Sequence, residues 1–407
     1  MIAATGRIAA NIIVWTILLL LVVLPALTGS GSSVVGVLLA LLLLPVLFDR
    51  SARAAIGRQP AMWIFLGAFV AIMICYAITA RDPGNLLYGT ALLALPLAPL
   101  LFGAMPRWQA DHPALVLAGL CLAGTLICAL VAANSAYVLQ GGRAVGFLMG
   151  PNLLARIALW LGFLGLGGLF LTRSRWRYVL HLGPLAAILV LVLTGTRGAI
   201  LALPCSVLIL GGFLATDRRE RWHLFALIAL GVVAGLLVLA NSARFEGLIA
   251  VVGDVLSGRH SSDGATAERL TMLQGAWGAF LHSPWIGFGW ANLVPAAALS
   301  MDMTPYGTAP GGLFQFHNDF ANFAVAAGIV GVLALLAIQI APTIGALAGP
   351  RDAYFRARLY CCLQLTVSTF IFGLTDLTLG YDLPTTLHVF LAAIVLGTFR
   401  ESPEPKA

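Results

Sequence analysis

Long apolar stretches separated by short polar connectors run along almost the whole chain of 407 residues. A helix needs about 20 residues to cross a hydrocarbon core of about 30 Å, and the stretches are close to that length. The pattern predicts an all-α polytopic membrane protein with about 12 transmembrane helices, forming a single integral-membrane domain over residues 1–407. The expected spans lie near 11–28, 33–49, 61–79, 86–104, 113–133, 152–172, 178–194, 198–216, 223–240, 317–346, 359–375 and 384–399.

Positive charge alternates between the connectors. Those on one side hold 16 arginine and lysine residues, those on the other side hold 6, and Arg156 lies just inside a span. Cytoplasmic connectors of membrane proteins carry the excess of positive charge. The alternation therefore favours an even number of spans and predicts that both termini are cytoplasmic.

Composition excludes several other classes of protein. With 60% hydrophobic and 10% charged residues, the chain is unlike soluble proteins, which carry about 25% charged residues. Most of its net charge of +7 lies in connectors on one side, which indicates contact with anionic membrane lipids and not with nucleic acid. All 6 cysteines fall inside apolar stretches, so neither a disulfide framework nor a zinc site is expected.

One connector is much longer than the others. Residues 241–315 form a loop on the outer side between the ninth and tenth spans, and long loops of this kind usually have a function. Within the loop, large apolar residues recur at helical spacing and predict an amphipathic helix that lies on the bundle or in the membrane interface. They are Leu270, Leu273, Trp277, Phe280 and Leu281.

A few arginines stand on the outer side, where the cytoplasmic bias does not explain them. Arg197 lies in the turn Thr194-Gly195-Thr196-Arg197-Gly198, and a guanidinium there needs a wet cavity or an anionic partner. Arg269 comes just before the apolar stripe of the loop. The alternatives are a snorkelling arginine at Arg197 and pairing of Arg269 with Glu268 or Asp263 on a solvated face. Arg244 is a more ordinary candidate in the same loop.

His317 opens the tenth span in the sequence Phe316-His317-Asn318-Asp319-Phe320. A histidine at such a boundary can accept a proton from a hydroxyl group, although a purely structural hydrogen bond is the commoner role. The outer carboxylates form no Asp-x-Asp pair, and no phosphate-binding Gly-rich loop with lysine is present. We therefore expect neither a metal nor any other cofactor.

The order of these motifs resembles the O-antigen ligase and polymerase superfamily of bacterial envelope glycosyltransferases. The resemblance covers residues 140–340 by motif. One departure is the pair Ala326 and Ala327, because the family often has an acidic residue there. The matching pieces are Gly150-Pro151-Asn152, the turn at 194–198, Arg269 with Trp277, Ser283-Pro284-Trp285-Ile286-Gly287-Phe288-Gly289, and His317-Asn318 with Gly328 and Gly331.

The resemblance implies a GT-C-like enzyme of the bacterial inner membrane that moves a glycan from undecaprenyl diphosphate to an acceptor at the periplasmic face. Carried over by position, Arg197 and Arg269 would bind the diphosphate, and His317 would serve as base or orient the acceptor. Asn152, Asn318 and Arg244 complete the expected substrate-binding set, without metal or nucleotide.

The resemblance is compatible with several classes of acceptor. The preferred interpretation is a ligase that joins the polysaccharide to lipid A–core. The alternatives are a polymerase that extends a lipid-linked glycan and a protein O-oligosaccharyltransferase. A transporter or flippase with twelve spans is a different class. It is disfavoured because the sequence shows no inverted repeat, no paired broken helices and almost no charge in the middle of a span.

Overall fold

The computed structural model describes residues 2–140, 142–215, 257, 264–300 and 315–400, and the regular structure within these ranges is helical apart from isolated bridges. Eight of the described helices are long and apolar enough to cross a membrane, and three shorter apolar helices accompany them. All of them coincide with expected spans. The expected span at 223–240 lies outside the described residues, so the fold is that of a polytopic membrane protein whose total of twelve spans stays a prediction.

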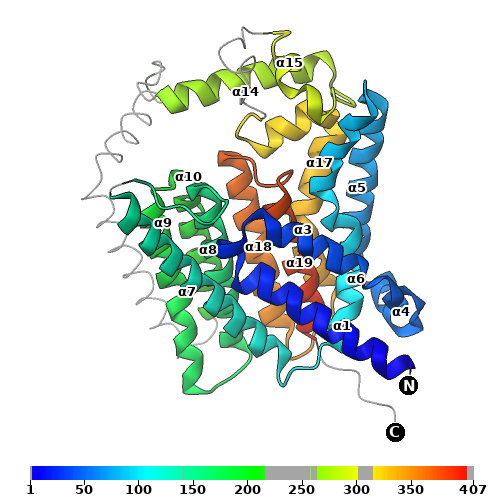
Figure 1. Ribbon diagram of the computed structural model, residues 1–407, viewed down its shortest axis with the longest axis vertical. Coiled ribbons are helices and arrows are strands. Elements are labelled where there is room, and N and C mark those ends of the chain that lie inside the picture. Colours follow the sequence, from blue (N-terminus) through cyan, green and yellow to red (C-terminus); the bar gives the residue numbers. More distant parts are fainter. Residues whose placement is uncertain (1, 141, 216–256, 258–263, 301–314, 401–407) are drawn as a thin grey trace.

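The first half of the chain forms an antiparallel succession of helices (Figure 1). Several are extended by a turn of 3-10 or π helix, so one span can comprise two labelled elements. In chain order the α-helices are α1 (Ile2–Leu18), α2 (Pro25–Thr28), α3 (Ser30–Leu41), α4 (Arg50–Arg58), α5 (Pro60–Thr79), α6 (Ala94–Ala104), α7 (Pro113–Leu139), α8 (Pro151–Gly165), α9 (Leu182–Thr194), α10 (Arg197–Ile200) and α11 (Ala202–Leu214). The 3-10 segments 83–92 and 175–181 lead into α6 and α9.

The second half supplies the helices that lie nearest the candidate site. They are α14 (Gly264–His282), α15 (Leu293–Ala297), α17 (Asp319–Ala348), α18 (Phe355–Thr375) and α19 (Asp382–Thr398).

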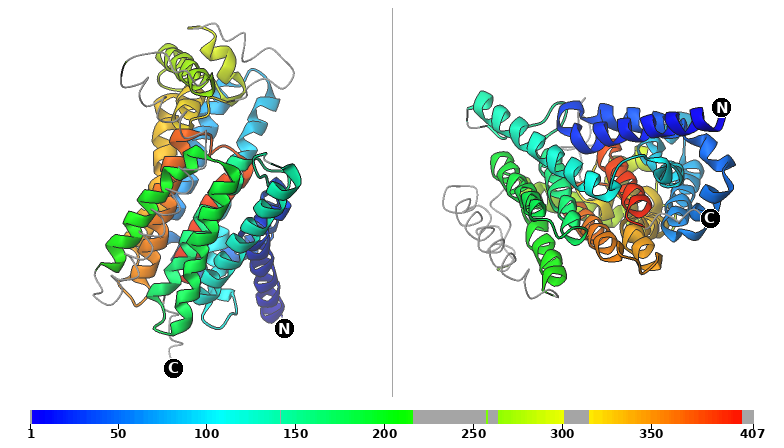
Figure 2. Two further views of the ribbon diagram at one scale, coloured as in Figure 1. Left: turned by 90° about the vertical axis from the view of Figure 1, so that its left-hand side faces the viewer. Right: turned by 90° about the horizontal axis from the view of Figure 1, so that it is seen from below.

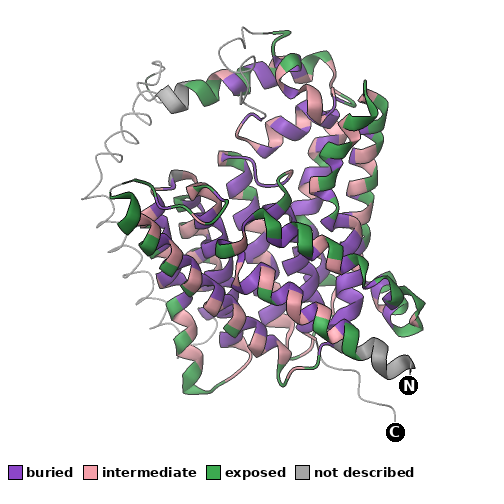
Figure 3. Cartoon of the chain, viewed as in Figure 1, coloured by how far each residue is buried: buried purple, intermediate pink, exposed green. Residues whose placement is uncertain are grey.

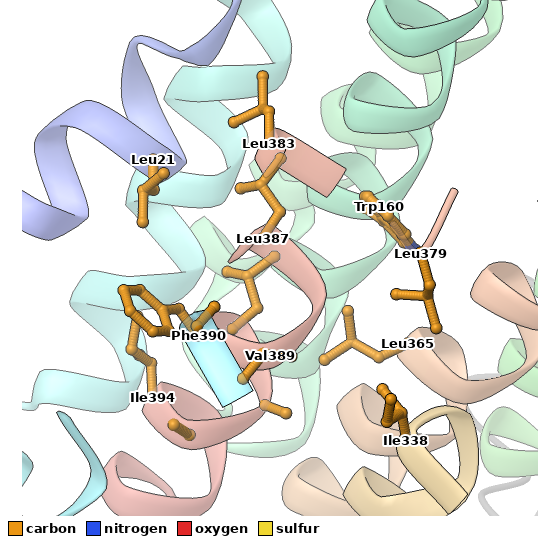
Figure 4. Close-up of a cluster of buried hydrophobic side chains, with 14 of the residues drawn as sticks. Leu21, Trp160, Ile338, Leu365, Leu379, Leu383, Leu387, Val389, Phe390 and Ile394 are labelled. Atoms are coloured by element: carbon orange, nitrogen blue, oxygen red, sulfur yellow. The ribbon is translucent and has the colours of Figure 1, made fainter. Parts of the chain in front are cut away.

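Two helices form the centre of the bundle. In α8 every residue from Leu154 to Gly165 is buried, and in α19 every residue from Leu383 to Thr398 is buried. Figure 3 shows this burial at the middle of the molecule, and Figure 4 shows Trp160 of α8 and Leu387 of α19 in the core between the surrounding helices. Helices apolar on every side are typical of the interior of a membrane bundle.

The outer helices have an opposite pattern, with large apolar side chains turned away from the protein. Leu38 of α3, Ile78 of α5 and Leu130 of α7 are exposed. In water such a surface would drive aggregation, whereas in a bilayer it contacts lipid tails.

Helices α14 and α15 lie across one end of the bundle, roughly at right angles to the spans below them (Figures 1 and 2). Helix α1 begins and α19 ends at the opposite end (Figure 1). Helix α14 packs against α17 and α15, and its buried side chains are Met272, Ala276 and Ala279.

Candidate active site

Asn318 fixes the start of α17. Its side-chain oxygen accepts a hydrogen bond from the backbone N–H of Ala321 at 3.0 Å, which caps the first turn. Its amide nitrogen donates to the backbone oxygen of Leu374 at 2.9 Å, near the end of α18. His317, one residue earlier, therefore stands beside the loop that follows α18. Its φ of 50° is a conformation that costs a non-glycine residue on the order of 1 kcal/mol and that occurs often at functional sites.

The segment 283–289 holds the first turns of α17 from the other side. The N–H groups of Phe288 and Gly289 donate to the backbone oxygens of Val325 and Ala326, at 2.8 and 2.9 Å. In the same region, the N–H of Ile329 donates to the backbone oxygen of Pro284 at 2.7 Å. These bonds satisfy backbone groups that a kink in α17 releases, so the segment and the kink form one unit.

Glycine is required on both sides of this unit. Gly287 and Gly328 have φ values of 67° and 61°, in the left-handed region. A Cβ on Gly328 would lie 2.4 Å from the backbone carbon of Trp285, and one on Gly287 would lie 2.5 Å from the nitrogen of Ala327. The aromatic-glycine motif and the glycines of the tenth expected span are thus two halves of one packing contact, which sets the direction of the turns next to His317.

Asp376 is the centre of the polar network. It follows α18 and accepts a bond from Nδ1 of His317 at 2.7 Å through Oδ1. Its Oδ2 accepts from the amide of Asn152 at 2.9 Å and lies 3.2 Å from Nη2 of Arg156. The side chain of Asp376 is 11% exposed and that of Arg156 is 3% exposed, whereas His317 is 27% exposed. The histidine is therefore the member of the network that an incoming substrate can reach.

The charge state of Asp376 follows from these partners. Burial by itself raises the pKa of the carboxyl, but the hydrogen bond from His317, the charge of Arg156 and the amide of Asn152 outweigh burial and hold its pKa well below the ordinary range. An ionised Asp376 accepts the proton on Nδ1 of His317. This tautomer leaves Nε2 as the ring nitrogen that can accept a proton.

The loop that carries Asp376 is pinned by two further charged groups. Arg156 donates to the backbone oxygen of Leu377 at 2.9 Å and to the hydroxyl of Thr378 at 3.1 Å. Asp319, fully buried at the start of α17, accepts the N–H of Thr378 at 2.7 Å. The position of Asp376 relative to His317 is therefore set by α8 and α17 together.

Arg143 extends the network to the turn after α9. Its Nε donates to the backbone oxygen of Thr194 at 2.7 Å, and its Nη2 donates to the side-chain oxygen of Asn152 at 2.7 Å. Asn152 thus accepts at one end and donates to Asp376 at the other. A continuous chain of hydrogen bonds joins Arg143, Asn152, Asp376 and His317.

Residues 182–336 match the family model described as O-antigen ligase. This stretch of the chain is therefore similar to the O-antigen ligase and polymerase superfamily. Among curated proteins, none matches the chain. The matched residues include α9, the segment 283–289 and the start of α17. Arg197, Arg269 and His317 therefore lie inside the matched stretch, whereas Arg156 and Asp376 lie outside it.

The arginines that the resemblance singles out lie around this network. Arg197 begins α10, and the glycine after it packs against Thr375, where a Cβ on Gly198 would lie 2.5 Å from the hydroxyl. Arg269 is exposed on α14, close enough to Arg156 for their like charges to repel. Arg244 lies outside the described residues. The residue after Arg197 thus contacts the end of α18, whereas Arg269 lies on α14.

The two asparagines of the expected substrate-binding set have partners within the protein. Both ends of the Asn152 amide are bonded, to Arg143 and to Asp376. Both ends of the Asn318 amide are bonded as well, to the backbone at 321 and 374. Their geometry in the free enzyme is therefore that of positioning residues around His317.

Sequence reasoning missed the central role of Asp376, which counted only as one of several outer carboxylates. Arg156 was the available signal, because a charged residue inside a span requires a partner at the same depth. Only the packing of α8 against α18 shows that this partner is Asp376. Among the described residues, no three histidine, cysteine or acidic side chains are grouped as metal ligands are.

Proposed function

We propose that the protein is an O-antigen ligase, which transfers polysaccharide from undecaprenyl diphosphate to a sugar hydroxyl of lipid A–core at the periplasmic face of the inner membrane. The observation that carries the proposal is the pair of His317 and Asp376, with Nδ1 and Oδ1 2.7 Å apart at the end of the bundle that α14 covers. The match of residues 182–336 to the O-antigen ligase family model supports the class of reaction.

In the proposed reaction, the acceptor hydroxyl oxygen attacks the anomeric carbon of the donor sugar. Its proton passes to Nε2 of His317, while Asp376 holds the ring by its other nitrogen and stabilises the imidazolium that forms. The bond between the anomeric carbon and the diphosphate oxygen breaks, and the lipid diphosphate leaves with the bonding electrons. Attack opposite the leaving group inverts the anomeric centre.

The arginines have a separate task. Negative charge grows on the diphosphate as the bond breaks, and planar guanidinium groups match phosphate oxygens with two parallel hydrogen bonds. Arg269 on α14 and Arg197 at the start of α10 are assigned to this charge. Arg156 is assigned elsewhere, because its guanidinium is bonded to Asp376, Leu377 and Thr378. The proposed reaction uses no metal ion.

A deletion strain tests the proposal through its lipopolysaccharide on a gel. A ligase is required for every attached polymer, so we expect loss of the whole ladder and accumulation of lipid A–core alone. A ladder reduced to a single repeat on the core would instead identify a polymerase. A full ladder would overturn both assignments. Transfer from a purified lipid-linked glycan in the presence of a chelator tests the metal-independent mechanism directly.

A further inference from the structure

Helix α14 has two apolar faces, and only one of them has a partner within the described protein. Met272, Ala276 and Ala279 are buried against α17 and α15. The opposite face carries the larger apolar side chains, of which Trp277 is 62% and Leu281 is 59% exposed, together with exposed Leu270 and Leu273. One methionine and two alanines thus face the protein, whereas the tryptophan and the three leucines face away from it.

These four residues, Leu270, Leu273, Trp277 and Leu281, form a stripe along one side of the helix. They follow one another at intervals of three and four residues, so they lie above one another on the helical surface. A helix rises about 1.5 Å per residue, which makes the stripe about 16 Å long. That length accommodates several isoprene units in a row.

Arg269 lies at one end of the stripe. It lies next to Leu270 and one turn before Leu273, and it is exposed like them. One end of the stripe therefore carries a positive charge, and the rest of the stripe is apolar. A molecule complementary to this surface has an anionic head followed by a long apolar tail.

We propose that the stripe on α14 is the track for the polyprenyl tail of the lipid diphosphate donor, with the diphosphate at Arg269. The proposal rests on the proposed function, since it places the tail of that donor. A glycan is a poorer occupant, because sugar hydroxyls need polar partners and Gln274 is the main polar side chain beside the stripe. The track explains why a helix that lies across the bundle carries its large apolar residues on its unburied face.

Two probes that share a head group test the track without any glycan transfer. They are undecaprenyl diphosphate and dimethylallyl diphosphate, whose single isoprene unit ends before the stripe does. In the double variant Leu273→Ser/Leu281→Ser, the dissociation constant for undecaprenyl diphosphate in detergent should rise about tenfold, from the loss of roughly two apolar contacts. The constant for dimethylallyl diphosphate should stay unchanged, whereas Arg269→Gln should weaken both.

Leu299→Ser is the matched control. Leu299 is 59% exposed, like Leu281, but it lies after α15 and off the stripe, so its replacement should leave both constants unchanged. Equal effects of the double variant on the two probes, or none on the long one, would overturn the track. A loss confined to binding of phosphatidylglycerol vesicles would do the same and would make the stripe a membrane anchor. If long-chain selectivity is found but no glycan is transferred, the track stands and the proposed reaction fails.

Discussion

The surroundings of Asp376 and the surface of α14 carry charges for the same proposed reaction but are built in different ways. Around Asp376, side chains from α8 and the start of α17 hold one another through short hydrogen bonds, and Arg156 is almost fully buried. On α14, Arg269 and the stripe are exposed, and the helix is attached through small side chains and the segment 283–289.

This difference matches two different demands. A base must keep its ring nitrogen aligned with one hydroxyl, so its partners have to be rigid and fully bonded. A surface that receives a bulky lipid-linked polymer must open and close around it, which favours an element with few buried contacts. The following predictions separate the two demands, because a change near Asp376 should act on turnover and a change on α14 should act on donor affinity.

The largest effect is expected at His317. His317→Ala removes the proton acceptor, so turnover should fall about a thousandfold while donor binding persists. The measurement is transfer from purified lipid-linked glycan in detergent, with donor affinity determined separately.

His282→Ala provides the matched control for His317. His282 is exposed at the end of α14, and its Nδ1 contacts the backbone oxygen of Gly278 on the same helix at 2.8 Å. Its replacement should be silent. High activity of His317→Gln would reduce His317 to a scaffold for the start of α17.

Asp376→Asn should lower turnover about a hundredfold, because an amide holds the imidazole without stabilising its charged form. The exposed carboxylate Asp382, at the start of α19, supplies the control Asp382→Asn, which should retain activity. If Asp376→Asn lost donor affinity but kept its turnover, Asp376 would bind the donor instead of supporting His317 as the base.

The same substitution should destabilise the fold, since it removes the ion-pair partner of the buried Arg156. The pKa of Asp376 is depressed in the folded protein, so its contribution to stability is present above the ordinary carboxyl pKa of about 3.9 and is lost as the pH falls below that value. The difference in melting temperature between wild type and Asp376→Asn should therefore be largest at neutral pH and shrink at about pH 3. A constant difference would contradict this electrostatic account.

On the α14 side, Arg269→Lys should reduce transfer about thirtyfold at limiting donor, and Arg197→Lys should behave in the same way. An ammonium keeps the charge but loses the planar pair of donors that a diphosphate accepts. Glu268→Gln, at the neighbouring exposed position, should have little effect. Full activity of both lysine variants would make the arginines simple charge anchors.

The smallest effect is expected at Asn152, whose amide links Arg143 to Asp376. Asn152→Ala should lower turnover about fivefold and leave the Michaelis constant for the donor unchanged, because the hydrogen bonds from Arg143 and to Asp376 are lost behind the base. A rise in that constant with normal turnover would restore Asn152 to the substrate-binding set.

The hydrophobic pattern and the motifs were enough to predict most of the spans and several residues of the candidate site. Eleven of the expected spans coincide with apolar helices because a helix that crosses lipid must bond its own backbone and present apolar side chains over its whole length. The glycines at 287 and 328 were recognisable as a motif, although their mutual contact was not. His317 and Arg269 could be singled out because polar groups at the ends of spans are costly without a purpose.

The partners of those residues were decided by tertiary structure alone. Asp376 lies 59 residues beyond His317 and 224 beyond Asn152, and no periodicity relates such distant positions. The sequence also did not determine whether the stripe on α14 is exposed, since the spacing of its residues is the same whether the stripe faces the bundle or the lipid. Helical periodicity determines which residues share a face of one helix, whereas the packing of helices against one another decides which faces meet.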